Sequence, residues 1–431
     1  MLEPPRQITP APLAAENRLI LLLARGTLDR NAQDQARALL LVALDWQVIL
    51  ERVTAEQVYP LVYRNLYALG FVGVPAKARG RLHNLARINA LRNTLLSEEL
   101  TRVLKLFAHA GIAAIPLKGA ALADSLYGDP TLRVCADIDL LVPRPMVGPA
   151  LELLRSAGYR SQFTGHFFAN VLLQNDIECA LTREVSGFRY ILELHWGVLW
   201  GARFDRPAID EIWAESVAAT VLGAPAYALS LEWQVLFLAA HAARHQWQGL
   251  KWLVDIHELC SSAPIDWRQL NKTAKRLGWD KVLRLTLHAC HTLFATPMPS
   301  SHFQGLLPPW IRLFPAHAPA SWRDAFLATR LLPRPAEKMR YLLRVFWVPT
   351  LAEYQWLALP ARLSFLYYPL RPLRLVMKWS GSLAGAAYKQ TALSLTALIY
   401  PAPGTEHQAA NSPVADRQAG DAAPLAAKVG Q

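Results

Sequence analysis

Apolar positions at three- and four-residue spacing dominate the first part of the chain. Between residues 14 and 110 they recur in this way, as at Ala36, Leu40 and Leu44, with few Gly or Pro interruptions. A helix brings residues three and four apart onto one face, which can pack into a core. The spacing therefore predicts a helical N-terminal region.

The pattern changes at Gly111, where a short apolar run at 112–117 ends in the polar turn Lys118-Gly119. A short apolar run bounded by turn residues is typical of a buried strand. The sequence then predicts a helix at 120–127, a strand at 137–142, a helix at 147–157 capped by Gly158 and a strand at 189–196. This alternation indicates an α/β core.

Helical spacing returns after residue 229. Ser230 is a suitable N-cap for a helix that runs to about residue 245, and a second helix is predicted at 250–260. From about residue 297, frequent prolines predict short helices. Beyond residue 401, Ala, Gln, Gly, Pro and Asp predominate and predict a disordered tail.

These elements predict an α+β protein that is helical overall. At 431 residues the chain exceeds the usual length of one domain. We expect five parts: an N-terminal helical region at 1–105, an α/β core at 106–205, a helical domain packed on the core at 206–300, a basic, proline-broken helical region at 301–400 and a disordered tail at 401–431.

The composition fits a folded protein with an uneven charge distribution. Hydrophobic residues make up 53% of the chain and charged residues 18%, and the formal net charge is +12. Residues 301–380 hold eleven Lys or Arg and three acids, so 11 − 3 = +8 of that charge lies there. We therefore expect an anionic partner, nucleic acid or anionic lipid, at this segment rather than at the α/β core.

Cysteine usage and hydropathy favour a cytoplasmic protein. The four cysteines are widely separated and form no C-x-x-C pair, which suits a reducing compartment. No stretch reaches the roughly 20 apolar residues that span a bilayer. The apolar run at 19–24 lacks a small-residue cleavage site, so it is interpreted as a helix core and not as a signal peptide.

An acidic pair lies in the predicted strand at 137–142. Residues two apart in a strand share a face, so Asp137 and Asp139 present their carboxylates side by side. Such pairs also occur on solvated strand edges, but here an apolar run follows directly, and an unused pair would cost stability. Bound divalent cations relieve the repulsion, and Mg²⁺ or Mn²⁺ at carboxylates supports phosphoryl transfer.

A two-metal site needs a third acid, and Glu193 is the first choice. It shares a strand face with His195, and we expect it to bind the metal that activates an acceptor hydroxyl. Asp176 and Glu178 show the same two-apart spacing and remain the alternative.

The turn before the helix at 120–127 is a candidate phosphate site. Gly119 permits close approach of the backbone to a phosphate at a helix N-terminus, and Lys118 adds positive charge. Arg133 can reach triphosphate oxygens from the incoming strand. Alternatively, Lys118 is a surface lysine, and Arg133 pairs with Asp129 or with the acidic pair.

Two histidines, a lysine and an aspartate on the later helices are further candidates. His241 and His245 are four apart, as zinc ligands can be, but the H-E-x-x-H signature is absent, which favours core or supporting histidines. Lys251 and Asp255 are also four apart and form either a helix-surface pair or part of the site. Together with His195, these four residues are candidates for groups that support the metal site.

Several motifs carry a family resemblance: Leu117-Lys118-Gly119, Leu126-Tyr127-Gly128-Asp129, Leu132-Arg133, Asp137-Ile138-Asp139-Leu140-Leu141-Val142, Gly158-Tyr159, Glu193-Leu194-His195-Trp196, His241 with His245, and Trp252-Leu253-Val254-Asp255. Together they resemble the bacterial "uncharacterised nucleotidyltransferase" family, a branch of the DNA-polymerase-β-like superfamily, over residues 40–290. The resemblance implies a small mixed sheet with flanking helices, a divalent-metal site at Asp137, Asp139 and Glu193, and nucleotide held near Lys118-Gly119. It also implies transfer of a nucleoside monophosphate from a nucleoside triphosphate (NTP) to a hydroxyl, in surface-polysaccharide or peptide biosynthesis.

One departure supports a second hypothesis. The wider superfamily has Gly-Ser at the phosphate turn, whereas this chain has Gly119-Ala120 and lacks that hydroxyl. The alternative is a catalytically weak or inactive scaffold, docked to a partner or to the inner membrane face through the basic segment at 301–380. Modification of nucleic acid is less supported, because no basic-aromatic groove motif flanks the acids.

Overall fold

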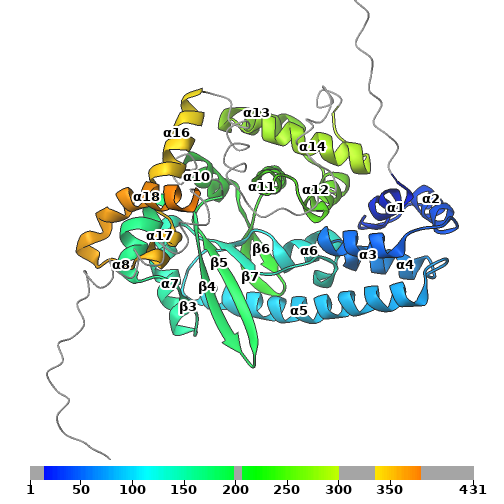
Figure 1. Ribbon diagram of the computed structural model, residues 1–431, viewed down its shortest axis with the longest axis horizontal. Coiled ribbons are helices and arrows are strands. Elements are labelled where there is room, and N and C mark those ends of the chain that lie inside the picture. The colour runs from blue at the N-terminus through cyan, green and yellow to red at the C-terminus, as the bar shows by residue number, and fades with distance from the viewer. Residues whose placement is uncertain (1–13, 199–205, 300–334, 380–431) are drawn as a thin grey trace, which may run out of the picture.

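The computed structural model describes residues 14–198, 206–299 and 335–379, and its N-terminal part is helical as predicted. The fifth helix, α5, is 34 residues long and runs along one side of the molecule, from the N-terminal helices to the sheet (Figure 1). Asp29 and Asp45 cap α2 and α3 through their side chains. The helices are α1 (Ala15–Leu23), α2 (Arg30–Leu40), α3 (Trp46–Ala55), α4 (Tyr59–Ala68) and α5 (Ala76–His109).

A five-stranded mixed sheet with the order β1-β2-β5-β4-β3 follows. Only the central pair β2–β5 is parallel within this sheet, and the other three pairs are antiparallel. The predicted α+β class and the mixed sheet are thus confirmed. The strands are β1 (Ile115–Pro116), β2 (Ile138–Leu141), β3 (Arg160–Ser161), β4 (Glu178–Val185) and β5 (Phe188–His195).

Two helices connect these strands where the sequence predicts them, α6 (Gly119–Tyr127) and α7 (Val147–Ser156). Gly158 follows α7 with φ at +92°, and the next amide, of Tyr159, donates to the carbonyl of Leu154 at 3.0 Å. This is the left-handed end that glycine permits. Short helical turns complete the connections: η1 (Pro130–Leu132), η2 (Arg144–Met146), α8 (Gly165–Phe167), η3 (Phe168–Leu172) and α9 (Leu173–Asn175).

Two β-hairpins were not predicted from the sequence. β4 joins β5 through Ser186-Gly187, and β6 (Val217–Val221) joins β7 (Ala224–Ala228) through Leu222-Gly223. All four turn residues have positive φ, as two-residue hairpins with the right strand twist require. Ser and Leu are unusual at such positions, so the turns carry only a weak sequence signal.

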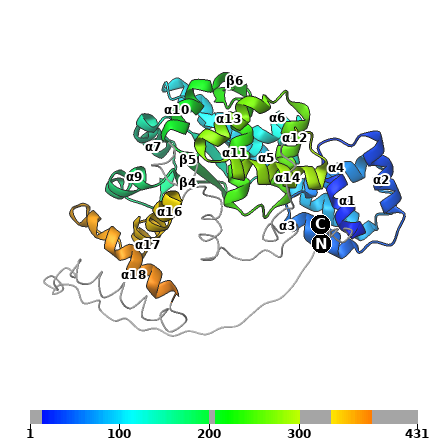
Figure 2. The same ribbon diagram turned by 90° about the horizontal axis from the view of Figure 1, so that it is seen from above.

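The helices after the second hairpin share a core with the N-terminal helices. Ser230 caps α11 by accepting the Trp233 amide at 3.5 Å, as predicted. Buried side chains of α11, α12 and α14 pack against α1 and α4, and Figure 2 shows these groups adjoining. These helices are α11 (Leu231–Arg244), α12 (Leu250–Ser262), α13 (Trp267–Leu277) and α14 (Asp280–Phe294), and α10 (Arg206–Glu215) precedes the hairpin.

The C-terminal helices lie at the opposite end of the molecule, beside the sheet (Figure 2). Tyr367 is completely buried in the core of the sheet, and its hydroxyl accepts the Leu359 amide at 2.7 Å. This part therefore packs on the sheet domain, which was not predicted from the sequence. Its elements are α16 (Pro335–Trp347), α17 (Leu351–Trp356), η5 (Ala361–Leu366) and α18 (Tyr367–Trp379).

Within the three described ranges, every helix is too short or too polar to cross a membrane. The predicted disordered tail at 401–431 lies outside the described residues, as does most of the predicted proline-broken stretch before α16.

Candidate active site

Strand β2 places the acidic pair at the edge of a buried core. Ile138 and Leu140 are 4% and 0% exposed and point into that core, and Asp139 lies between them. Asp139 is itself only 2% exposed. Asp137 precedes the first residue of the strand, and its side chain is 25% exposed, so its carboxylate is closer to solvent.

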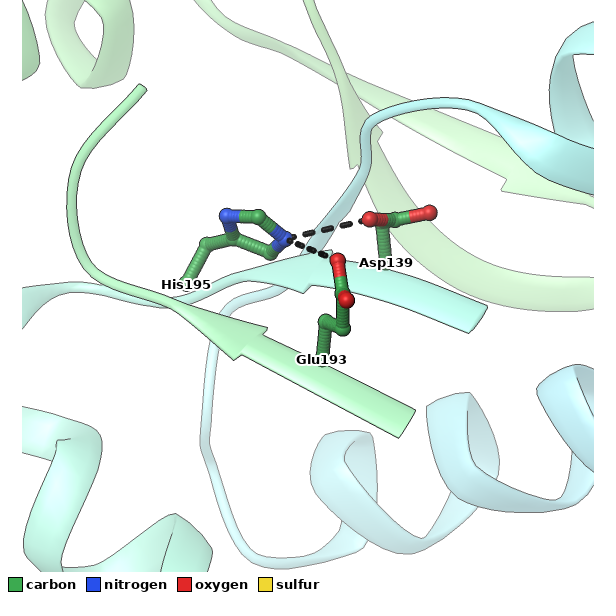
Figure 3. Close-up of side chains that lie close together, drawn as sticks. All are labelled: Asp139, Glu193 and His195. Atoms are coloured by element: carbon green, nitrogen blue, oxygen red, sulfur yellow. Dashed lines mark hydrogen bonds and ion pairs between the residues drawn. The ribbon is translucent and has the colours of Figure 1, made fainter. Parts of the chain in front are cut away.

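The parallel neighbour β5 brings the third acid beside Asp139. The register pairs Asp139 with Glu193 and Leu141 with His195, so two strands far apart in sequence deliver both carboxylates to one place. The Nε2 atom of His195 lies 3.1 Å from Oδ1 of Asp139 and 3.7 Å from Oε2 of Glu193 (Figure 3).

The three side chains in Figure 3 form a set that fits a divalent metal ion. One ligand atom from each of Asp139, Glu193 and His195 lies within 4.8 Å of the other two. Carboxylates and imidazole are common ligands of divalent metal ions in proteins. The set differs from the expected one in a single member, because Asp137 faces Lys118 and lies outside this group.

Lys118 bridges the two aspartates. Its Nζ atom lies 3.0 Å from Oδ2 of Asp139 and 3.5 Å from Oδ1 of Asp137, and its side chain is 12% exposed. It is therefore not the surface lysine of the alternative interpretation. Gly119 follows with φ at +74°, where a Cβ would lie 3.4 Å from the carbonyl oxygen of Asp137. The backbone thus turns tightly against the acidic pair.

The charges of the site are strongly coupled. Burial lowers the pKa of Lys118, but Asp139, Asp137 and Glu193 outweigh this effect and raise it overall. Burial likewise raises the pKa of Asp139, but Lys118 and His195 bring it below its usual value. For His195 burial lowers the pKa, whereas hydrogen bonds to Asp139 and Glu193 raise it to about 10. Two cations thus neutralise the buried acids.

The pKa of Glu193 shifts in the opposite direction from that of Asp139. A hydrogen bond from His195 lowers its pKa, but burial and the neighbouring carboxylates Asp139 and Glu178 raise it overall. A carboxylate with a raised pKa is a stronger base, which suits a group that accepts a proton.

A comparison with protein families assigns the chain to one of them. Residues 43–295, more than half of the chain, match the family described as "Uncharacterised nucleotidyltransferase". The chain belongs to that family. No curated protein matches the sequence. A solved structure, an antigenic nucleotidyltransferase-like protein from Paracoccidioides brasiliensis, is 19% identical over 50% of this chain and 97% of its own, with a TM-score of 0.29.

Of the two alternative acids, Glu178 lies at the edge of this acidic site. Glu178 begins β4, and its Oε2 atom is 3.1 Å from Nδ1 of His195. Arg244 on α11 contacts both oxygens of Glu178, at 2.9 and 3.4 Å. Asp176 instead accepts the neighbouring amide of Ile177 through its side chain. Arg244 was not a candidate from the sequence, where it stands between the two histidines of α11.

Arg133 faces away from the acidic group. Its guanidinium, only 4% exposed, pairs with Asp255 at 2.8 Å, and the hydroxyl of Tyr127 donates to the same carboxylate at 2.9 Å. Asp255 is completely buried, so Arg133 neutralises it. Arg133 therefore pairs with Asp255 rather than with Asp129 or the acidic pair, and the buried Asp255 does not form a helix-surface pair with Lys251. The contact of Arg133 with triphosphate oxygens stays a prediction.

The loop that leads to Asp137 is fixed from two sides. The Nζ atom of Lys251 donates to the carbonyl of Val134 at 3.2 Å. On α5, buried Asn89 donates to the carbonyl oxygens of Thr131 and Arg133, and buried Asn93 donates to those of Pro130 and Arg133. These asparagines were not predicted from the sequence. Two Asn four apart inside a long helix were the available signal, because Asn is unfavourable there.

The two histidines of α11 contact Trp252 of α12. The rings of His241 and His245 lie 4.8 Å apart, and His245 stacks on Trp252 at 4.4 Å. Burial, and secondarily nearby cations including Lys118, lower the pKa of His241 and bring that of His245 to about 4. Both are therefore neutral near pH 7. His241 meets Trp252 edge-on whereas His245 stacks on it, so both rings pack between α11 and α12.

Proposed function

We propose that this protein transfers a nucleoside monophosphate from an NTP to a hydroxyl group, with Asp137, Asp139 and Glu193 as its acidic centre. The observation that carries the proposal is the register of β2 and β5, which sets Asp139 beside Glu193 in a chain of the nucleotidyltransferase family. Two adjacent carboxylates and a nearby lysine are the groups that nucleotidyl transfer needs.

In the proposed reaction, the acceptor oxygen forms a bond to the α-phosphorus and the bond to the pyrophosphate leaving group breaks. Glu193, with its raised pKa, accepts the proton of the acceptor hydroxyl. Asp139 and Glu193 would hold a divalent ion, and Asp137, at the solvent side, would complete the acidic centre. Bound Mg²⁺ or Mn²⁺ would lower the pKa of the hydroxyl and neutralise developing charge.

Lys118 and Gly119 would receive the triphosphate. The ammonium of Lys118 stays protonated at neutral pH because its pKa is raised, so it can pair with phosphate oxygens. Gly119 presents backbone next to the acids without a side chain. Ala120 has no hydroxyl to add, so in this proposal the lysine and the backbone bind the phosphates.

The proposal is tested by incubating the protein with NTPs labelled at the α-phosphate, Mg²⁺ or Mn²⁺, and sugar, lipid-linked and peptide acceptors of surface-polysaccharide or peptide biosynthesis. The expected result is a labelled acceptor that depends on the metal and on both aspartates. Equal labelling by wild type and the Asp137→Ala/Asp139→Ala variant would refute it.

A second function, docking to an anionic membrane surface, is supported by α16. Met339, Leu342, Leu343 and Trp347 are 44–58% exposed on this helix, and a helix brings these positions onto neighbouring parts of its surface. Exposed apolar side chains in a basic segment favour contact with lipid.

Some of the positive charge in this segment serves the fold instead. Arg371 and Arg374 pair with buried Glu353, and Arg344 donates to the carbonyl of Asn175. Membrane docking would therefore depend on the apolar face of α16 more than the net charge suggests. Sedimentation with anionic vesicles tests it: the full chain should sediment and the Leu343→Glu/Trp347→Glu variant should not. Equal sedimentation of both, or of neither, would refute docking through α16.

A further inference from the structure

We infer that His195 is a direct metal ligand, held in position by Glu178, and that its imidazole makes the site prefer Mn²⁺ to Mg²⁺. The inference rests on the proposed metal centre and specifies its chemistry. It assigns His195 to the ion itself, whereas the three acids alone would form an all-oxygen site.

The orientation of the imidazole is the first observation. Nε2 faces the two carboxylates, at 3.1 Å from Asp139 and 3.7 Å from Glu193 (Figure 3). His195 is 5% exposed, so its ring has little freedom to turn away. One atom each from the three residues can therefore reach the same ion.

The environment of the other ring nitrogen is the second observation. Nδ1 of His195 lies 3.1 Å from Oε2 of Glu178. Histidines that bind metals almost always donate their second nitrogen to a carboxylate, carbonyl or water, which fixes the tautomer and the ring. A metal ion at the acidic centre would replace the Nε2 proton of the charged ring, and the remaining proton on Nδ1 would lie beside Glu178.

Glu178 is itself fixed by the sheet and by α11. The antiparallel register of β4 and β5 pairs Glu178 directly with His195. Arg244 contacts both oxygens of the Glu178 carboxylate, which leaves that carboxylate in one orientation. The contacts thus run from Arg244 to Glu178, from Glu178 to His195, and from His195 to the proposed metal position.

The chemistry of the ligand set decides the metal preference. Mg²⁺ selects oxygen ligands and binds nitrogen poorly, whereas Mn²⁺ accepts carboxylates together with imidazole. Replacing one oxygen ligand by a buried imidazole therefore weakens the binding of Mg²⁺ more than the binding of Mn²⁺. Glu178 acts as a positioning residue in this arrangement, because it reaches the ion only through His195.

The experiment measures Mn²⁺ and Mg²⁺ binding to the full chain by calorimetry, and examines the Mn²⁺ complex by pulsed electron paramagnetic resonance, which detects nitrogen bonded to Mn²⁺. Wild type should bind Mn²⁺ more tightly and show nitrogen coupling. His195→Gln should lose the coupling and the preference. Glu178→Gln should weaken Mn²⁺ binding by about 10-fold to 100-fold, and Glu184→Gln, at an exposed site on the same strand, should not.

A Mn²⁺ complex of wild type without nitrogen coupling, coupling that persists in His195→Gln, or no Mn²⁺ binding would each overturn the inference. The wild-type spectrum gives this answer even if a variant fails to fold. Nucleotidyl transfer is measured separately on the same samples. Transfer without nitrogen coupling refutes the role of His195 alone, and nitrogen coupling without transfer refutes only the proposed reaction.

Discussion

At the scale of single residues, Lys118 has the most direct link between charge and function. Its ammonium contacts both Asp137 and Asp139, so it neutralises the acidic pair when no other cation is present. In the proposed reaction the same ammonium pairs with the triphosphate. The lysine therefore stabilises the unliganded site and contributes to substrate binding.

We predict that Lys118→Ala weakens NTP binding by about tenfold or more, because it removes a charge-assisted hydrogen bond. Titration with a non-hydrolysable NTP measures this loss. Lys77→Ala, at an exposed position on α5, is the control and should leave the affinity unchanged. Unchanged affinity in Lys118→Ala would place the triphosphate elsewhere.

A second residue-scale prediction concerns Arg133. Arg133→Ala should lower the free energy of unfolding by about 3–5 kcal/mol, because it leaves Asp255 charged and unpaired inside the protein. The double variant Arg133→Met/Asp255→Leu should lose less stability than Arg133→Ala. Arg37→Ala, in an exposed pair with Asp34, is the control and should change little. Unfolding in denaturant measures the stability of all three variants. An unchanged free energy of unfolding in Arg133→Ala would contradict the structural role of Arg133.

The sequence reveals the residues of the site more readily than their partners. Asp139 and Glu193 could be proposed because strand alternation and apolar context are local signals. The pair Arg133–Asp255 spans 122 residues, and nothing near Arg133 indicates which acid it meets. The contact of Glu178 with His195 likewise depends on the register of a hairpin.

At the scale of elements, the turn between β1 and α6 determines how closely backbone approaches the acids. Gly119 has a left-handed φ and lies against the Asp137 carbonyl, so a side chain there is strained. The sequence indicated this turn through Lys118-Gly119. It gave no comparable signal for β4, since the turn Ser186-Gly187 is short and the strand exposes several polar residues.

We predict that Gly119→Ala costs about 1–2 kcal/mol of stability, because a non-glycine residue disfavours left-handed backbone. It should also reduce NTP affinity, since the added methyl group lies where phosphate would approach. Gly148→Ala, in helix α7 with open space around its Cβ, is the matched control and should be neutral or slightly stabilising. Equal stability of the two variants would show that the turn is not constrained.

At the scale of the whole molecule, α5 connects the two hydrophobic cores. Ala78 and Leu82 near its start pack with the helical core, whereas Val103 and Phe107 near its end pack with the sheet. The helical N-terminal region was predicted, but its shared core with the later helices was not. The spacing of apolar residues predicts which face of a helix is buried. It does not predict which other element covers that face.

The C-terminal helices α17 and α18 are held to one another partly through charge. Burial raises the pKa of Glu353, but the Thr350 amide, Arg374 and Arg371 outweigh burial and lower it overall. A lowered pKa in the folded state stabilises the fold above the unfolded pKa, and this stability is lost as pH falls through the folded pKa.

Acid should therefore loosen α17 and α18 as the pH falls below about 4.5. Hydrogen exchange at 351–379 should increase there in wild type, and Glu353→Gln should show fast exchange already at neutral pH. Exchange that is independent of pH and identical in the two proteins would contradict this account.

The central claim is metal-dependent transfer of an NMP group at Asp139 and Glu193, and one comparison tests it most directly. Wild type and Glu193→Gln are incubated with Mn²⁺, a hydroxyl acceptor and NTP labelled at either the α- or the γ-phosphate. The account predicts that wild type transfers the α-label and releases the γ-label as pyrophosphate, and that Glu193→Gln transfers neither. Transfer of the γ-label to the acceptor, or equal α-label transfer by Glu193→Gln, would contradict it.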